Sequence, residues 1–176
     1  MTVKRLTGVG YCARLSRVGD WAFNFAFRLA QRHDMRLNIF FFPDPPCGPH
    51  AARGRHGERL RLAEKEKIEL ERQVRLYYDE RLGDFLNVGF RLCEGDEEPE
   101  LLRCLLIRKD YDILVLAYED RGCLFGARPI EQFAERMACP TVIVGPNRSD
   151  ELYLNTPARL WTDILELDDG EWLPLA

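Results

Sequence analysis

The sequence contains no apolar run that approaches the ~20 residues needed for a membrane-spanning helix. Its opening residues, "MTVKRLTGVGYCARL", also lack an apolar run followed by a small-residue cleavage site, which a secretion signal would have. No two of the 6 cysteines form a CxxC pair, and most lie inside apolar segments. These absences predict a protein that does not bind membranes and keeps free thiols in the cytoplasm.

Catalytic and metal-binding motifs are missing as well. The chain has no GxSxG, no HExxH, no Walker lysine and no paired-carboxylate signature, which favours a binding domain over an enzyme. Cys47, His50 and His56 share one loop, but their spacing matches no common zinc pattern, so we expect no metal site. The arginines between Arg53 and Arg61 lack interleaved aromatic residues, so we expect no nucleic-acid partner.

The sequence does contain a regular alternation of strand and helix patterns. Short apolar stretches predict strands, and apolar residues spaced three and four apart predict helices. We expect Asp20 to cap the first helix and Pro129 to stand at the first position of the last one. This alternation predicts a single α/β domain with a doubly wound, five-stranded parallel sheet and helices on both faces. The predicted strands are 6–12, 35–43, 85–93, 111–118 and 140–146, and the predicted helices are 21–33, 58–82, 94–110 and 129–137.

The C-terminal residues do not continue this alternation. We therefore divide the chain into an α/β domain, residues 1–146, and an acidic extension, residues 147–176. The segment "ILELDDGEWLPL" suits a hairpin that turns at Asp169-Gly170. Two interpretations remain open: either the extension packs on its own domain, or it pairs with a second subunit or another protein.

The segment "YDILVLAYEDRG … FGARPIEQFAERMACPTVIVGP" resembles the closing part of the universal stress protein family. Residues 112–116 and 139–144 match the two strands that end a typical member. The resemblance covers about residues 5–146, and it implies a Rossmann-like sheet with strand order 3-2-1-4-5. It also implies a role in stress response or regulation, and a homodimer that pairs through the fifth strand, here 140–146, at the sheet edge.

In that fold the strand order reverses between strands 1 and 4, so a ligand crevice is expected at their carboxyl ends. Many family members bind ATP there through G-x-x-G-x₉-G-[ST]. In this chain the first two glycines align with Ala117 and Asp120, and Gly126 is too early for the third. An Asp-Gly-Ser step after strand 1 is replaced by Arg14-Leu15-Ser16. The resemblance thus implies a degenerate member without the usual ATP mode. The crevice residues that we expect are Arg14, Ser16, Phe41, Ala117, Tyr118, Asp120, Arg121, Gly122, Gly126 and Arg128.

Our leading hypothesis is a non-catalytic binding or regulatory domain with no cofactor. The alternative is a sensor of an adenine nucleotide, ATP or AMP, or of another anion, with weak ATPase activity as one form of it. For that alternative, Arg14, Arg17, Arg121 and Arg128 would converge on the crevice beside the helix that starts at Pro129. In the opposing interpretation these arginines are solvated or paired with Glu119 and Asp120.

Overall fold

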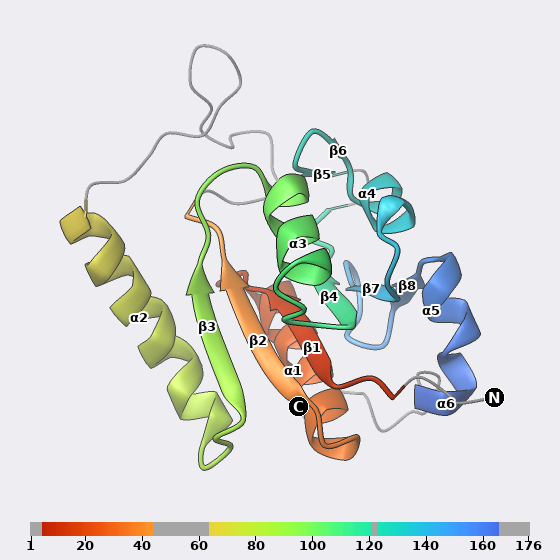
Figure 1. Cartoon of the computed structure of the whole chain (residues 1–176), viewed down its shortest axis with the longest axis horizontal. Coiled ribbons are helices and arrows are strands. Elements are labelled where there is room, and N and C mark those ends of the chain that lie inside the picture. The colour runs from red at the N-terminus through yellow and green to blue at the C-terminus, as the bar shows by residue number, and fades with distance from the viewer. Residues whose placement is uncertain (1–4, 44–63, 121–122, 166–176) are drawn as a thin grey trace.

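The computed structural model describes residues 5–43, 64–120 and 123–165. A six-stranded sheet forms its centre, in the order β3-β2-β1-β4-β7-β8 (Figure 1). Its first five strands are parallel and the sixth is antiparallel to its neighbour. The strands are β1 (Gly8–Cys12), β2 (Arg36–Phe41), β3 (Val88–Leu92), β4 (Ile113–Ala117), β7 (Thr141–Val144) and β8 (Leu152–Leu154). The predicted order 3-2-1-4-5 is therefore confirmed, and β8 extends it.

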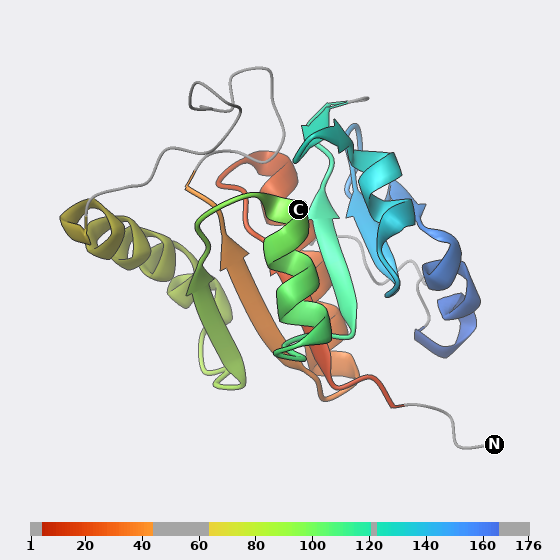
Figure 2. The same cartoon turned by 45° about the horizontal axis from the view of Figure 1, so that its top comes forward.

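Helices cover both faces of this sheet, as Figure 2 shows for α3 in front and α1 behind. Among the described residues, no helix is both long enough and apolar enough to span a membrane. A short antiparallel pair, β5 (Leu124–Phe125) and β6 (Arg128–Pro129), precedes α4. The helices are α1 (Arg17–Arg32), α2 (Glu64–Leu82), α3 (Glu97–Leu106), α4 (Ile130–Arg136), α5 (Thr156–Leu160) and α6 (Thr162–Leu165).

The core is divided by the sheet into two apolar clusters. One cluster joins α1 and α2 to one face and includes Phe23, Leu29 and Tyr78. The other joins α3 and α4 to the opposite face and includes Leu101 and Phe133. Every residue of β1, β4 and β7 is buried. Strands that are covered on both faces need apolar side chains throughout, which explains the continuous apolar runs in the sequence.

Three helix starts differ from the prediction, and α3 begins at Glu97, three residues later than expected. Helix α1 begins at Arg17, because the Ser16 side chain caps it by accepting a hydrogen bond from the Gly19 N–H at 3.0 Å. Asp20 lies in the first turn and accepts a hydrogen bond from the Tyr77 hydroxyl at 2.6 Å. Pro129 is the N-cap of α4 and not its first residue, so this helix begins one residue later than expected, at Ile130. The predicted second helix is confirmed over Glu64–Leu82, and its first residues, 58–63, lie outside the described residues.

The acidic extension packs on its own domain as far as it is described. Strand β8 pairs with β7, so β7 is an interior strand, and the expectation that 140–146 forms the sheet edge is wrong. Asn155, which is completely buried, fastens the connection. Its side chain accepts from the N–H groups of Thr141 and Ala158, both at 2.9 Å, and donates to the carbonyls of Ala134 and Cys139 at 2.8 and 3.0 Å. The hairpin predicted at Asp169-Gly170 lies outside the described residues.

Candidate functional site

The expected crevice lies at the carboxyl ends of β1 and β4, where the strand order reverses. One of its walls is the loop that connects β1 to α1. In this loop the Ser16 hydroxyl donates a hydrogen bond to the Glu119 carboxylate, which follows β4. The guanidinium of Arg14 lies 3.5 Å from the same carboxylate, and both side chains are largely buried, with 16% and 20% exposed. Glu119 thus connects the two sides of the crevice with its own negative charge.

Buried tyrosines hold the β1–α1 loop from beneath. The Tyr11 hydroxyl donates to the Gly19 carbonyl at 2.8 Å and accepts from the Arg14 N–H at 3.3 Å. It also lies 2.9 Å from the Tyr78 hydroxyl of α2. Burial raises the pKa of Tyr11 well above its ordinary value, so this hydroxyl stays neutral and keeps its proton for donation. Sequence reasoning missed both tyrosines, because each lies within an apolar pattern that predicts packing alone.

Gly19 permits this arrangement by having no side chain. A Cβ atom built on Gly19 would lie 1.8 Å from the Arg14 carbonyl oxygen, far closer than any real contact. The first turn of α1 therefore touches the loop backbone directly. This close approach places the Ser16 cap and the Arg14 side chain at the mouth of the crevice.

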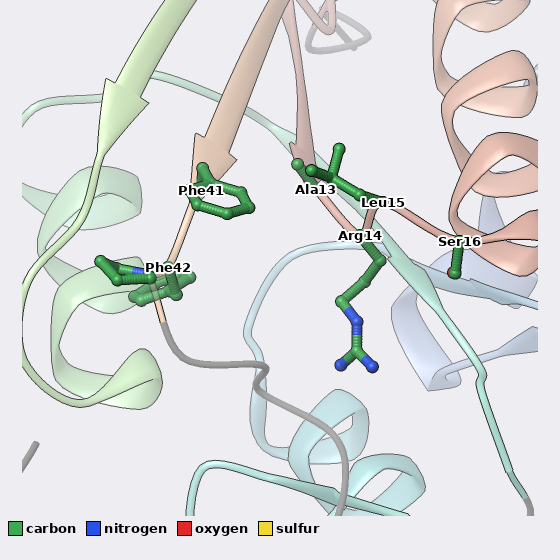
Figure 3. Close-up of a pocket in the computed structure, with 7 residues that line it drawn as sticks. Ala13, Arg14, Leu15, Ser16, Phe41 and Phe42 are labelled. Atoms are coloured by element: carbon green, nitrogen blue, oxygen red, sulfur yellow. The ribbon is translucent and has the colours of Figure 1, made fainter. Parts of the chain in front are cut away.

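Beside the loop is a hollow of about 230 Å³, which we call the carboxyl-end hollow. Figure 3 shows Arg14 extending from the end of β1 while the ring of Phe41 lies across the space on the adjacent strand. The volume is below the ~300–1,000 Å³ that is usual for small-molecule sites. The structure therefore brings together three of the predicted residues, Arg14, Ser16 and Phe41. The lining residues are Ala13, Arg14, Leu15, Ser16, Phe41, Phe42 and Pro43.

The predicted residues on the β4 side have other partners. Ala117 is buried at the end of β4, and the Tyr118 hydroxyl donates to Glu131 of α4. Asp120 is exposed, and its backbone carbonyl accepts a hydrogen bond from the Cys123 N–H at 3.1 Å. Gly126 adopts a left-handed φ of 64° between β5 and β6. Arg121 and Gly122 lie outside the described residues.

The arginines do not converge on a common anion as far as they are described. The guanidinium of Arg17 lies 5.2 Å from the centre of the Trp21 ring. Arg128 donates to Glu98 of α3 at 3.1 Å, and Arg136 donates to the other oxygen of that carboxylate at 2.9 Å. Burial raises the pKa of Glu98, but the two guanidinium groups outweigh it, and the net effect is a pKa below the ordinary value. Arg128 thus forms an ion pair between β6 and α3, and Arg14 pairs with the crevice carboxylate itself.

Metal binding has no support in the described residues, which contain no group of three or more histidine, cysteine or acidic side chains placed to hold an ion. Cys47, His50 and His56 lie outside this part of the chain. What remains in the crevice is a guanidinium, a hydroxyl and a carboxylate that are already bonded to one another, next to a small apolar hollow.

Fold and crevice together define a Rossmann-like α/β domain with its candidate site at the point where the strand order reverses. No family model matches the sequence, and no curated protein matches it by sequence. Solved structures of universal stress proteins, however, match its fold, and the chain has the universal stress protein fold.

Three of these structures illustrate the likeness. UspA from Lactobacillus plantarum has 14% sequence identity and a TM-score of 0.55, with 81% of this chain and 100% of that chain covered. A universal stress protein in complex with cAMP has 17% identity and a TM-score of 0.51, covering 81% and 98%. The universal stress protein from Archaeoglobus fulgidus in complex with dAMP has 12% identity and a TM-score of 0.52, covering 80% and 98%.

Proposed function

We propose that this chain is a cytoplasmic, universal-stress-protein-like regulatory domain that acts by binding and assembly and does not hold ATP in the usual family mode. The observation that carries the proposal is the Glu119 carboxylate, which is bonded to Ser16 and Arg14 across the crevice. A phosphate placed beside this carboxylate would be repelled by its charge, and the paired Arg14 would offset only part of that repulsion. Glu119 also occupies the donors that would otherwise be offered to a phosphate.

The test compares nucleotides on the wild-type protein and on Glu119→Gln, which removes the charge but keeps the shape. We expect millimolar ATP to leave the melting temperature of the wild-type protein unchanged, because a ligand stabilises a fold only when its concentration exceeds its Kd. Glu66→Gln, an exposed carboxylate on α2, is the matched control. A rise of several degrees for the wild-type protein with ATP contradicts the proposal.

A second candidate function is a sensor of a nucleoside monophosphate. It is favoured by the apolar carboxyl-end hollow beside Arg14, and by the neighbours whose structures contain cAMP or dAMP. A monophosphate carries less charge into the crevice than a triphosphate does. Under this function AMP or cAMP raises the melting temperature of the wild-type protein while ATP does not, and Phe41→Ala removes the effect.

The homodimer implied by the resemblance is part of the proposal. Since β8 already covers β7, a second copy of this chain has to pair through a different surface from β7. Light scattering at high micromolar concentration tests the assembly, and a uniform monomer contradicts this part alone. We also propose that the chain consists of a domain, residues 1–146, and an extension, residues 147–176. We propose that the extension packs on its own domain and does not bind a partner protein.

A further inference from the structure

A second hollow lies at the opposite end of the sheet, among the loops that lead into β1, β4 and β7. Its volume of about 570 Å³ falls within the ~300–1,000 Å³ range of small-molecule sites, and it is more than twice the volume of the carboxyl-end hollow. We call it the amino-end hollow. Its apolar walls include Leu6, Leu105, Tyr111, Pro140, Pro157 and Trp161.

The acidic extension builds one wall of the amino-end hollow. Pro157 belongs to α5 and Trp161 follows it directly, on the side where the blue helices lie in Figure 1. Asn155, the N-cap of α5, fixes this wall to the body of the domain through its four side-chain hydrogen bonds. On another wall the Tyr111 hydroxyl donates to the Leu101 carbonyl at 2.6 Å, which fixes its ring. The walls are thus formed before any ligand arrives, and this reduces the entropy cost of binding.

The margin of the hollow exposes large apolar side chains. Leu106 lines the hollow and is 62% exposed, and its neighbour Ile107 is 76% exposed. Leu160, directly before Trp161, is 78% exposed. An apolar hollow continued by exposed apolar residues is a typical feature of a binding surface, whereas single exposed leucines are ordinary.

The polar groups of the amino-end hollow indicate the charge of its ligand. The Asp112 carboxylate is held by three donors, the Thr7 N–H at 2.6 Å, the Thr7 hydroxyl at 2.9 Å and the Gly8 N–H at 3.2 Å. Lys109 also lines the hollow, at a left-handed turn with φ 56°, and forms no ion pair with any residue that the structure describes. The adjacent Arg108, in contrast, pairs with Asp110 at 3.0 Å. Among the described residues Lys109 thus forms no ion pair, whereas the other charged group of the hollow, the Asp112 carboxylate, accepts from Thr7 and Gly8.

We propose that the amino-end hollow binds an amphipathic organic anion, with an alkyl or aromatic body against Trp161 and Leu105 and a single carboxylate at Lys109. The body excludes water from the apolar walls, which contributes about 25 cal/mol per Å² of buried apolar surface. The carboxylate pairs with Lys109, which has no ion-pair partner within the part of the chain that the structure describes. This site is independent of the proposed function, because it lies at the other end of the sheet from Glu119.

The experiment uses decanoate and decanol as matched probes, below the concentration at which either forms micelles. Binding is followed by calorimetry on the full chain, with the summed fluorescence of its 3 tryptophans, Trp161 among them, as a second signal. We expect Lys109→Gln to weaken decanoate about tenfold and to leave decanol unchanged, because only the ion pair is lost. Lys65→Gln, an exposed lysine on α2, should change neither probe.

The second variant is placed at the margin of the hollow and not at Trp161, because Trp161 also packs against the core and its substitution could disturb folding. Leu106→Glu changes an exposed side chain and places a negative charge at the margin, so it should weaken decanoate more than decanol. Decanoate affinity that is equal in the wild-type protein, Lys109→Gln and Leu106→Glu contradicts the proposal. So does a dimer, seen by light scattering, that binds neither probe and that Leu106→Glu converts to a monomer.

Discussion

The two ends of the sheet make opposite use of charge. At the carboxyl ends of β1 and β4, where the strand order reverses, Arg14 is paired with Glu119. The hollow beside this pair lies at the ends of β1 and β2 and measures about 230 Å³. At the amino ends, Lys109 has no ion-pair partner among the described residues and the hollow measures about 570 Å³. The position of a crevice is thus set by strand order, whereas its availability is set by a few side chains at its mouth.

The acidic extension accounts for much of this difference. It adds β8 to the sheet next to β7, and it places Pro157 and Trp161 beside the loops at the amino ends. The same segment therefore covers a strand edge and builds a wall. A sheet edge with unpaired backbone groups can pair with another chain. By covering the edge of β7, the extension prevents a second copy from pairing there, and it also forms a wall of the amino-end hollow.

The largest loss of stability is expected from Asn155→Ala, which removes the side chain that attaches one wall of the amino-end hollow to the domain. The change leaves the N–H groups of Thr141 and Ala158 and two buried carbonyls without their side-chain partner. We expect the free energy of unfolding to fall by about 3–4 kcal/mol, measured by urea denaturation. Asn147→Ala, an exposed asparagine in the same extension, should stay within about 0.5 kcal/mol. A loss below about 1 kcal/mol for Asn155→Ala would mean that the extension is held elsewhere.

A smaller loss of stability is expected from Gly19→Ala, at the carboxyl end of the sheet. The new methyl group would overlap the Arg14 carbonyl, so the loop that carries Ser16 has to move, at a cost of about 2–3 kcal/mol. Gly83→Ala is the matched control, because Gly83 has a left-handed φ of 58° and no atom within 4 Å of an added Cβ. It should cost about 1 kcal/mol through backbone strain alone. Equal losses for the two variants, measured by urea denaturation, would show that the close approach at Gly19 is unimportant.

The strands and their order were predictable, whereas the interactions that attach the extension to the domain were not. Continuous apolar runs such as residues 113–117 and 141–144 carry the signal of doubly covered strands, and the resemblance supplies their order. Strand β8 has only three residues, Leu152–Leu154, too few to display an alternating pattern. Asn155 followed by Thr156-Pro157 suits a turn or a helix N-cap, but its burial and its bonds to Thr141, Ala134 and Cys139 depend on the three-dimensional fold.

The crevice between β1 and β4 stays a prediction, whereas some contacts of its predicted residues can now be described. The residues that the resemblance selects, Arg14 and Ser16, do line it, and a pairing of the arginines with Glu119 was one of the alternatives. The bond from Ser16 to Glu119 joins residues 103 positions apart, so only the three-dimensional fold reveals it. The cap of α1 was misplaced because Gly19 lowers helix propensity in the first turn and suggests a later start.

The smallest loss of stability is expected from Glu135→Gln. This loss measures the contribution of the Glu135 charge to the attachment of the extension, for comparison with the contribution of Asn155. Glu135 accepts hydrogen bonds from the Tyr153 hydroxyl at 3.0 Å, the Thr156 N–H at 3.2 Å and the Thr156 hydroxyl at 3.0 Å. Burial raises its pKa, but these donors outweigh burial and the net pKa lies below the ordinary 4.5. The charged form is thus favoured by folding, so the stabilisation is complete above about pH 4.5 and is lost as the pH falls through the lowered pKa.

Because Glu135 is exposed, solvent screens the effect, and we expect Glu135→Gln to lower the free energy of unfolding by only about 0.5 kcal/mol near neutral pH. The difference from the wild-type protein should shrink as the pH falls below 4.5, since the wild-type carboxylate then becomes neutral too. Urea denaturation at three pH values measures it, with Glu66→Gln as the exposed control on α2. A difference that is constant with pH would assign the role of Glu135 to packing, and Asn155 would then be the dominant polar attachment of the extension.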